Sequence, residues 1–290
     1  MLAVTERRME YRRIELDEVE LKVGEAGQGP TVVLVHGSWD DHRVWDGVVQ
    51  HLRPHWRLVV YDRRGHGGSS VPPGQGRISQ DVLDLDGVIR AVDTGPVHLV
   101  GHSYGACVAL LYAARHPQRL ASVCLHEPPL FGVLAGLPEH AELARRTREA
   151  MAQAAVLIAA GEAAQGARLF AEEVALAGQS WESVMDASLR ATWVANAGTW
   201  LDQSRDPERL ALSPELLSAS PLPVLLTSGD RSPAAFEPGV ARLAAATPHA
   251  IRRTIPGAGH FPQLTHPQAL AHCLSEFLSL HSNPTTAPAP

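Results

Sequence analysis

Ser103 is the residue whose type and position best suit covalent catalysis. It lies in the pentapeptide Gly-His-Ser-Tyr-Gly at residues 101–105. The pentapeptide directly follows the apolar run 97–100 and precedes a stretch of helical period over 106–116. A serine at such a junction lies on a sharp turn, and the small residues two positions before and after it let strand and helix pass closely. Its hydroxyl then projects beside a helix N-terminus, which favours developing negative charge. The pattern predicts a nucleophilic serine.

A serine nucleophile needs a base, and the sequence holds 15 histidines. We predict His260, which lies in the Gly/Pro-rich segment Pro-Gly-Ala-Gly-His-Phe-Pro, between the last strand-like run (251–255) and the last predicted helix (267–278). A loop in that position places the imidazole at the same sheet edge as Ser103, where it can take the hydroxyl proton. His266 heads the closing helix and is better explained as a surface residue.

Backbone amides near the serine can stabilise an oxyanion. His36-Gly37-Ser38 follows the apolar run 31–35. In a doubly wound sheet, a loop at that point lies beside the serine turn, where ligands collect outside the carboxyl ends of the strands. The predicted oxyanion donors are therefore the backbone N–H groups of Ser38 and Tyr104. His36 itself is expected to order the loop.

The elements that must position these residues alternate along the chain. Short Val/Leu-rich runs are typical of parallel strands covered on both faces. They occur at 31–35, 58–61, 97–100, 122–125, 224–226 and 251–255. Stretches of helical period separate them at 44–52, 79–92 and 106–116, and residues 11–23 alternate like an antiparallel hairpin. The chain is therefore predicted to be an α/β protein with a mostly parallel, doubly covered sheet.

The alternation stops between residues 131 and 220, which are rich in Ala, Glu and Arg and read as several helices. We predict a core of residues 1–130 and 221–281, an inserted helical cap over 131–220, and a disordered Pro/Thr/Ala-rich tail over 282–290. The cap holds three of the six tryptophans. Trp193 and Trp200 stand one heptad apart and are expected to line the substrate pocket from one helical face. The alternative is that they pack only the cap's own core.

The composition excludes several function classes. The formal net charge of −6, without a basic run, argues against a nucleic-acid partner. Three dispersed cysteines, with no CxxC spacing, argue against a disulfide framework and against a zinc site. The N-terminal residues have no apolar signal region, and no stretch approaches the length of a membrane span. We therefore expect a cytoplasmic monomer or homodimer that acts on a small molecule without contacting membranes.

The segment Tyr-Asp-Arg-Arg-Gly-His-Gly-Gly-Ser at 61–69, together with the serine, oxyanion and histidine loops, resembles the α/β-hydrolase superfamily from Tyr11 to Leu280. The resemblance implies the α/β-hydrolase fold and chemistry without a cofactor or metal. It also implies hydrolysis of esters, lactones or amides through an acyl-enzyme, and the chain order serine, acid, histidine. In this family the residues of the 61–69 segment are usually structural, so Asp62, Arg64 and His66 are not assigned to catalysis.

The acid departs from the commonest family pattern, in which it stands three residues after a glycine that follows the seventh strand. Here that glycine is Gly229 and the position is Ser232, which cannot carry the required charge. Two replacements exist: Asp230, and Glu127 after the run 122–125. Some members, including one subgroup of haloalkane dehalogenases and the zearalenone lactone hydrolases, resemble the second arrangement. We favour Glu127. As a structural residue, Asp230 would form a turn and Glu127 a strand-end salt bridge.

The leading hypothesis is a serine hydrolase that cleaves a small or medium apolar ester or lactone beneath a helical cap, with Ser103, His260 and Glu127 as the triad. One alternative keeps the triad but cleaves a carbon–carbon bond or makes peracids. Another is a non-catalytic ligand receptor, against which the intact Ser/His pair argues. The serine also argues against dehalogenase and epoxide-hydrolase chemistry, which need aspartate at that turn.

Overall fold

The computed structural model describes residues 9–72, 76–93 and 95–282, so the predicted disordered tail lies outside the described residues except for Ser282. The described strands form one eight-stranded sheet in the order β1-β2-β4-β3-β5-β6-β7-β8. Their bounds are β1 Glu10–Leu16, β2 Val19–Ala26, β3 Thr31–Val35, β4 Arg57–Tyr61, β5 Val97–His102, β6 Leu120–His126, β7 Val224–Gly229 and β8 Ile251–Ile255. The predicted α/β architecture, with its mostly parallel sheet, is confirmed.

Strand pairing follows the apolar pattern. The hairpin β1–β2 is antiparallel and β2 pairs antiparallel with β4, whereas all pairs from β4 to β8 are parallel. The strand β3, Thr-Val-Val-Leu-Val, is buried along its whole length because helices cover both faces of the sheet. Alternate residues point to opposite faces: Val33 and Val35 belong to one apolar cluster, Val32 and Leu34 to the other.

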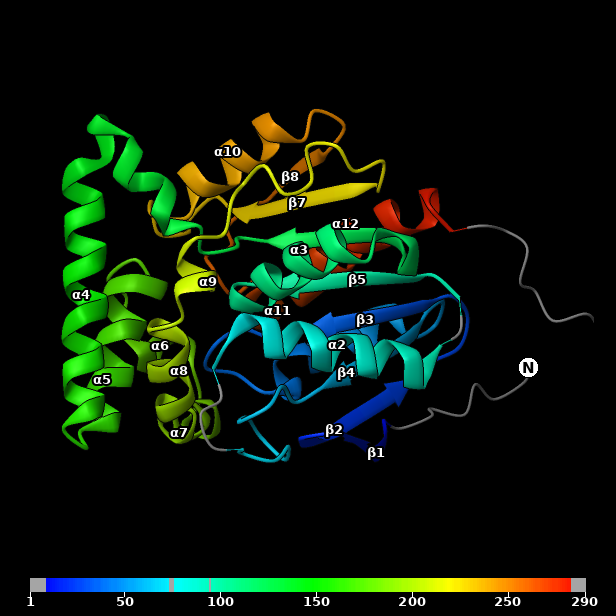
Figure 1. Ribbon diagram of the computed structural model, residues 1–290, viewed down its shortest axis with the longest axis horizontal. Coiled ribbons are helices and arrows are strands. Elements are labelled where there is room, and N and C mark those ends of the chain that lie inside the picture. The colour runs from blue at the N-terminus through cyan, green and yellow to red at the C-terminus, as the bar shows by residue number, and fades with distance from the viewer. Residues whose placement is uncertain (1–8, 73–75, 94, 283–290) are drawn as a thin grey trace, which may run out of the picture.

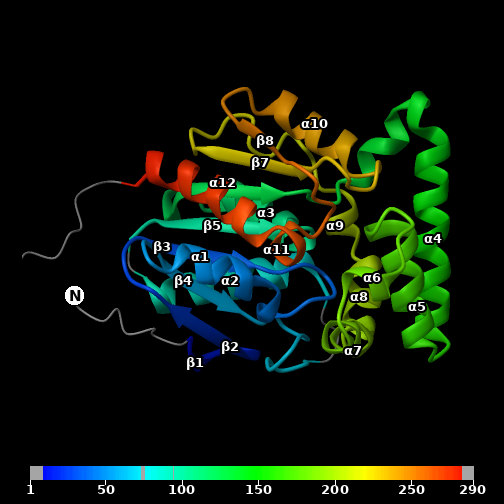
Figure 2. The ribbon, with the colours of Figure 1, turned by 180° about the vertical axis from the view of Figure 1, so that it is seen from behind.

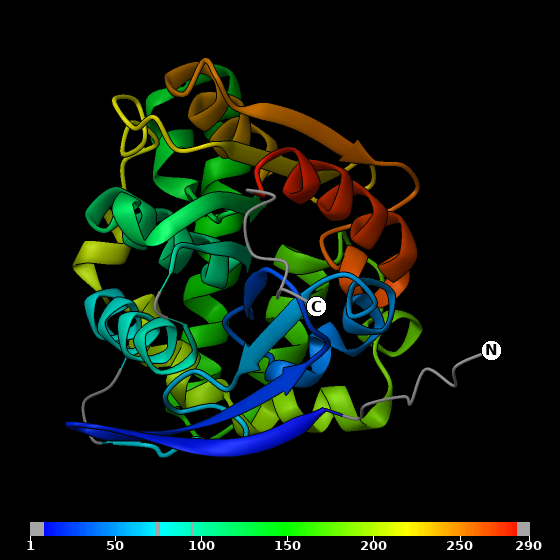
Figure 3. The ribbon, with the colours of Figure 1, turned by 90° about the vertical axis from the view of Figure 1, so that its right-hand side faces the viewer.

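Two helical layers cover the sheet (Figures 1 and 2). One layer contains α2 (Ile78–Val92), α3 (Tyr104–Arg115) and α10 (Glu237–Ala246), and the other contains α1 (Asp46–Leu52), α11 (Pro262–Thr265) and α12 (Pro267–Leu280). Figure 3 shows the twisted sheet between them. Short helices η1 (His42–Trp45) and η2 (Pro117–Arg119) complete this part of the chain. Its cysteines, Cys107, Cys124 and Cys273, are free.

Between β6 and β7 the chain forms only helices and loops, which stand beyond the carboxyl ends of the strands (Figure 1). They are η3 Phe131–Gly136, η4 Pro138–His140, α4 Ala141–Ala159, α5 Ala163–Phe170, η5 Ala171–Ala175, α6 Trp181–Val184, α7 Ala187–Ala195, α8 Ala197–Ser204 and α9 Pro207–Leu210. We call this region the cap. An apolar cluster joins it to the loops after β3 and β8, through Trp39 and Phe261.

The turn from β5 to α3 requires very close backbone approach. Ser103 has φ 54° and ψ −123°, a conformation that non-glycine residues rarely adopt. A Cβ atom on Gly101 would lie 2.4 Å from the carbonyl oxygen of Gly105, and one on Gly105 would lie 2.3 Å from that of Val35. The two glycines of the motif therefore let α3 cross directly over β5 and β3.

We predict that Gly105→Ala lowers the free energy of unfolding by about 1–3 kcal/mol, because β3 or α3 must move to admit the methyl group. Urea denaturation of the purified variant measures this change. Gly198→Ala is the matched control: Gly198 is exposed on α8, and a Cβ there would meet nothing within 4 Å. The control should be as stable as the parent protein or slightly more stable. Equal destabilisation by both substitutions would contradict the close-approach argument.

Candidate active site

Ser103 lies at the carboxyl end of β5, where the backbone turns into α3. Its backbone N–H donates to the carbonyl oxygen of His126, 2.9 Å away, so the turn is attached to the end of β6. The residue lines a cavity of about 20 Å³. Ser38, His260 and Trp193 line the same cavity, so the loops after β3, β5 and β8 and the cap meet there.

His260 is buried in the loop between β8 and α11. Its Nδ1 lies 2.7 Å from Oε2 of Glu127, and its ring stacks on Phe236 with centroids 3.9 Å apart. Burial lowers the pKa of the His260 imidazole, which keeps the ring neutral near pH 7. A neutral ring that donates Nδ1–H to a carboxylate has its lone pair on Nε2, and that nitrogen is then available as a base.

Glu127 follows β6 in an unusual backbone conformation, with φ 43°. Its side chain is 1% exposed, and its Oε1 accepts the backbone N–H of Gly229 at 2.9 Å. One carboxylate oxygen of Glu127 thus accepts a hydrogen bond from the end of β7, and the other contacts His260. A positive φ at a glutamate costs energy and occurs most often where function holds the side chain in place.

Asp230, the alternative acid, is engaged elsewhere. Its Oδ1 accepts the backbone N–H of Gly257 at 2.7 Å, and the residue is exposed. Ser232, at the position usual for the family's acid, is half-buried. His266 lies just before α12 with Nδ1 2.9 Å from the hydroxyl of Thr265. The structure therefore brings Glu127, and not Asp230, to His260.

The peptides of the 36–38 loop are held by the segment after β4. Arg63 donates from Nε to the carbonyl oxygen of His36 at 3.2 Å and from Nη2 to that of Gly37 at 2.9 Å. Nε2 of His66 lies 2.8 Å from the carbonyl oxygen of Ser38. These contacts fix the orientation of the loop peptides. The backbone N–H of Ser38 has no acceptor among the described residues, and neither has that of Tyr104, the first residue of α3.

Residues of the 61–69 segment are not among those that line the cavity, and besides holding the 36–38 loop they form other buried contacts. Asp62 accepts from His42 Nδ1 at 2.6 Å, and Arg64 pairs with Asp84 at 2.7 Å. Nδ1 of His66 lies 2.7 Å from the carbonyl oxygen of Arg64, within the same segment. These contacts connect β4, α2 and the loop after β3, as structural residues would.

Three residues near His260 and Ser103 had not been predicted as part of the site: His102 and Asp40, which line the cavity, and His126, which contacts Glu127. His102 packs against both His126 and His260, with ring centroids 5.6 and 4.8 Å away. His126 stands beside the carboxylate, with Nε2 3.6 Å from Oε2 of Glu127. In the sequence, His102 is marked only by its place as the second residue of the pentapeptide, and His126 only by its place directly before Glu127.

Asp40 is the third such residue, and it follows the predicted oxyanion loop by two positions. It lines the cavity and is buried, and its Oδ1 accepts from Nε1 of Trp193 at 2.9 Å. Burial raises the pKa of the Asp40 carboxyl to about 7. A buried acid in a predicted loop cannot be told from an exposed one by sequence pattern.

Ring nitrogens of His102, His126 and His260 lie within 4.8 Å of one another, a spacing that could hold a metal ion. Each ring already has one protein partner: the carbonyl oxygen of His260 for His102, Thr227 for His126 and Glu127 for His260. Glu127 would have to lose its hydrogen bond for His260 to bind a metal through Nδ1.

The two cap tryptophans lie differently from each other. Trp193 lines the cavity. Trp200 is not among the lining residues and stacks on Trp39, with centroids 4.8 Å apart. The expectation that both lie on one helical face is wrong, because α7 ends at Ala195 and α8 begins at Ala197.

Within residues 9–72, 76–93 and 95–282, no helix combines the length and apolar character needed to cross a membrane.

Comparison with known proteins agrees with this architecture. Residues 30–267 match the family described as alpha/beta hydrolase fold. The chain is 42% identical over 104 residues to the probable oxidoreductase EphD of Mycobacterium tuberculosis, a match that covers 34% of this chain and 18% of EphD. It is 32% identical over 112 residues to 2-(acetamidomethylene)succinate hydrolase of Mesorhizobium japonicum, covering 39% of this chain and 40% of that protein. The matched region thus spans less than half the length of either relative.

Among solved structures, the enol-lactonase of Burkholderia xenovorans LB400 is similar in fold, with a TM-score of 0.76 and 22% identity over 92% of this chain and 100% of the other. Cfl2 of Burkholderia cenocepacia has a TM-score of 0.74 and 26% identity, covering 93% of this chain and 95% of the other. The family match covers most of the chain and agrees with the eight-stranded sheet and its serine turn. The chain therefore belongs to the alpha/beta hydrolase fold family.

Proposed function

We propose that this protein is a serine hydrolase that cleaves an ester or lactone through an acyl-enzyme, without a cofactor. The observation that supports it best is the buried 2.7 Å contact between Glu127 and His260. It lies at the cavity that Ser103 and Ser38 also line. A carboxylate that orients a neutral imidazole beside a serine on a sharp turn is the arrangement that activates a hydroxyl nucleophile.

In the proposed reaction, Oγ of Ser103 attacks the carbonyl carbon of the substrate and its proton passes to Nε2 of His260. Negative charge moves to the carbonyl oxygen, where the amides of Ser38 and Tyr104 donate hydrogen bonds. Glu127 stabilises the imidazolium that forms. Collapse of the tetrahedral intermediate breaks the ester bond, and the leaving alkoxide takes the proton from His260.

Water then completes the cycle. His260 takes a proton from the water as its oxygen attacks the acyl carbon. The second intermediate collapses to a carboxylic acid and Ser103, which regains its proton from His260. Two similar proteins carry names that accord with such chemistry, a succinate-derivative hydrolase and an enol-lactonase. Another relative is named a haloalkane dehalogenase; the hydroxyl at Ser103, in place of a carboxylate, argues against that reaction here.

We expect Ser103→Ala to lower kcat for 4-nitrophenyl acetate by a factor of about 10⁴–10⁶, because the nucleophile is removed. The melting temperature should stay near that of the parent protein, since Ser103 is only half-buried and makes no side-chain hydrogen bond within the described residues. Rates are measured with active-site titration to exclude contaminating esterase. Activity above a few per cent in the variant would show that another residue attacks the ester.

The acid is tested by comparing Glu127→Gln with Asp230→Asn. Glutamine has one oxygen where Glu127 uses two, for His260 and for Gly229, so its NH₂ group faces one of these donors and disturbs the imidazole tautomer. We expect Glu127→Gln to lower kcat by about 10³–10⁴. Asp230→Asn keeps an oxygen for the Gly257 amide and should cost less than about tenfold. A larger loss in Asp230→Asn would transfer the role of acid to Asp230.

The pH dependence of kcat/KM reports the base in the free enzyme. Protonation of His260 removes the base, so activity falls as pH drops through its pKa. Because burial lowers that pKa, the midpoint of the acid limb should lie below 6.5, the usual histidine value. Tryptophan fluorescence at each pH verifies that the protein stays folded. The profile is repeated with Asp40→Asn, since Asp40 also lines the cavity. A midpoint above 6.5 in both proteins would contradict a buried neutral base.

A further inference from the structure

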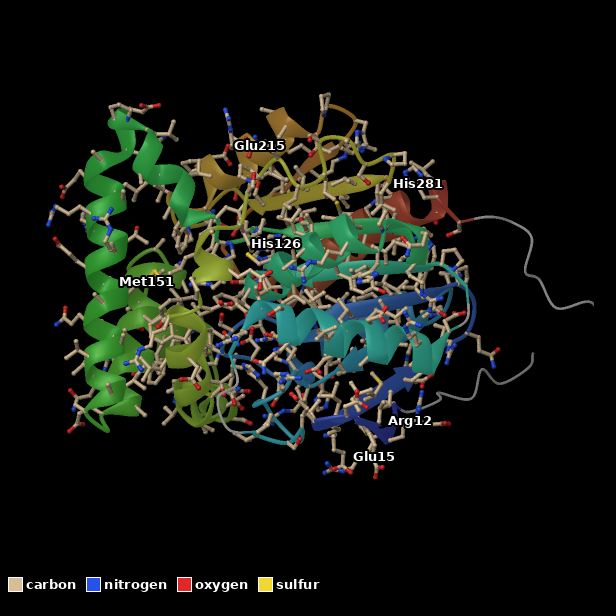
Figure 4. The ribbon with its side chains drawn as sticks, viewed as in Figure 1. Arg12, Glu15, His126, Met151, Glu215 and His281 are labelled. Carbon is tan, nitrogen blue, oxygen red and sulfur yellow. The ribbon has the colours of Figure 1, made fainter. Side chains whose placement is uncertain are left out.

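The cavity at Ser103 is too small for a substrate. Its volume of about 20 Å³ has room for about one water molecule. A second pocket of about 480 Å³ adjoins it and shares three lining residues: Pro129, Phe131 and Arg209. That volume is in the range of small-molecule sites. Figure 4 marks His126, at the end of β6, and Met151, which lines the larger pocket from α4.

The larger pocket is mostly apolar apart from its cations, with Thr147 and Ser204 as uncharged polar residues in its lining. Its walls come from η3, α4, α8 and α9, and include Leu130, Leu134 and Met151. Among the residues that the structure describes, three arginines line it, Arg148, Arg205 and Arg209, and no aspartate or glutamate does. An apolar chamber bordered only by positive charge is complementary to an amphipathic anion.

Arg209 is the arginine that reaches both cavities. It is 9% exposed, and its buried Nε has no hydrogen-bond partner. Within the described residues its guanidinium also makes no ion pair. The other buried arginines of the described part of the chain are paired: Arg63 with Asp81 at 2.9 Å and Arg64 with Asp84 at 2.7 Å. Arginine stays protonated in proteins, so Arg209 carries an uncompensated charge at the junction of the two cavities.

A purely structural role does not account for this charge. The one interaction of its guanidinium within the described residues is with the ring of Tyr104, whose centroid lies 5.8 Å from Cζ. Such a cation–π contact offsets only part of the free-energy cost of burying an unpaired ion. The difference favours a ligand that supplies the missing anion.

We propose that Arg209 binds a carboxylate of the substrate, so that the enzyme acts on esters or lactones that also carry a carboxylate group. The guanidinium fork matches a carboxylate with two parallel hydrogen bonds. The apolar part of the substrate then lies against Leu130, Leu134 and Met151, and its carbonyl reaches Ser103 past Phe131. This inference rests on the proposed hydrolase function and adds its substrate class.

The test uses two 4-nitrophenyl esters of equal chain length, the hydrogen glutarate and the pentanoate. In the parent protein, kcat/KM should be higher for the glutarate ester. Arg209→Met should lower the ratio of the two kcat/KM values by about 10- to 150-fold, the effect of losing a hydrogen bond between charged groups. Arg209→Lys should restore part of the ratio, because it restores the charge. Arg148→Met is the matched control: Arg148 is exposed on α4, where solvent screens its charge, and the ratio should change less than about threefold.

A binding measurement separates this inference from the proposed function. Calorimetry with Ser103→Ala, in chloride-free buffer, compares monomethyl glutarate with methyl pentanoate. Binding of the monoester that disappears in Ser103→Ala/Arg209→Met supports the carboxylate site even if neither nitrophenyl ester is hydrolysed. Circular dichroism verifies that the double variant is folded. An unchanged specificity ratio in Arg209→Met, or monoester binding that persists in the double variant, overturns the inference.

Discussion

The contact between Glu127 and His260 is the interaction on which the arrangement of the site depends. It joins the end of β6 to the loop after β8 and passes over β7, which lies between them in the sheet. Gly229 makes the span possible: its amide holds the other oxygen of Glu127, and a Cβ there would lie 2.2 Å from the carbonyl oxygen of Ala258. The left-handed backbone at Glu127 turns the side chain toward this gap. Three neighbouring strands therefore position one imidazole.

The other half of the site depends on buried cations. Arg63 holds the carbonyls of the loop after β3 and is itself neutralised by Asp81, so its desolvation is offset and the loop peptides are fixed. Arg209 is buried without such a partner at the junction of the two cavities. The same residue type thus supports the loop where it is paired and is suited to binding an anion where it is not. Both arginines are buried, so the presence or absence of a carboxylate partner distinguishes the structural role of Arg63 from the proposed binding role of Arg209.

The cap is attached to the loop that also offers the Ser38 amide. Nδ2 of Asn196 donates to the carbonyl oxygens of Trp39 and Asp40, and Nε1 of Trp193 donates to the Asp40 carboxyl. A movement of α7 or α8 would therefore be transmitted to the loop that lines the cavity at Ser103. With only about 20 Å³ beside Ser103, the proposed reaction requires Phe131 or the cap to move before a substrate can enter. These hydrogen bonds couple the position of the cap to the loop that carries Ser38, the proposed oxyanion donor.

Local pattern by itself determined the sheet, the serine turn and the histidine loop. Strand β3 and the Gly-x-Ser-x-Gly turn are encoded by consecutive residues, because continuous apolar runs and close backbone approach leave a local signature. The sequence already favoured Glu127 over Asp230 as the acid, but the geometry behind that preference is tertiary: it consists of the backbone turn at Glu127 and the Gly257 amide that Asp230 accepts. The heptad spacing of Trp193 and Trp200 wrongly predicted one shared helical face, because the helix breaks at Asn196. Which of the two rings reaches the cavity is decided by packing and not by spacing. The unpaired charge of Arg209 is likewise a tertiary property. A sequence records which charges exist, whereas the folded chain alone decides which of them are buried together.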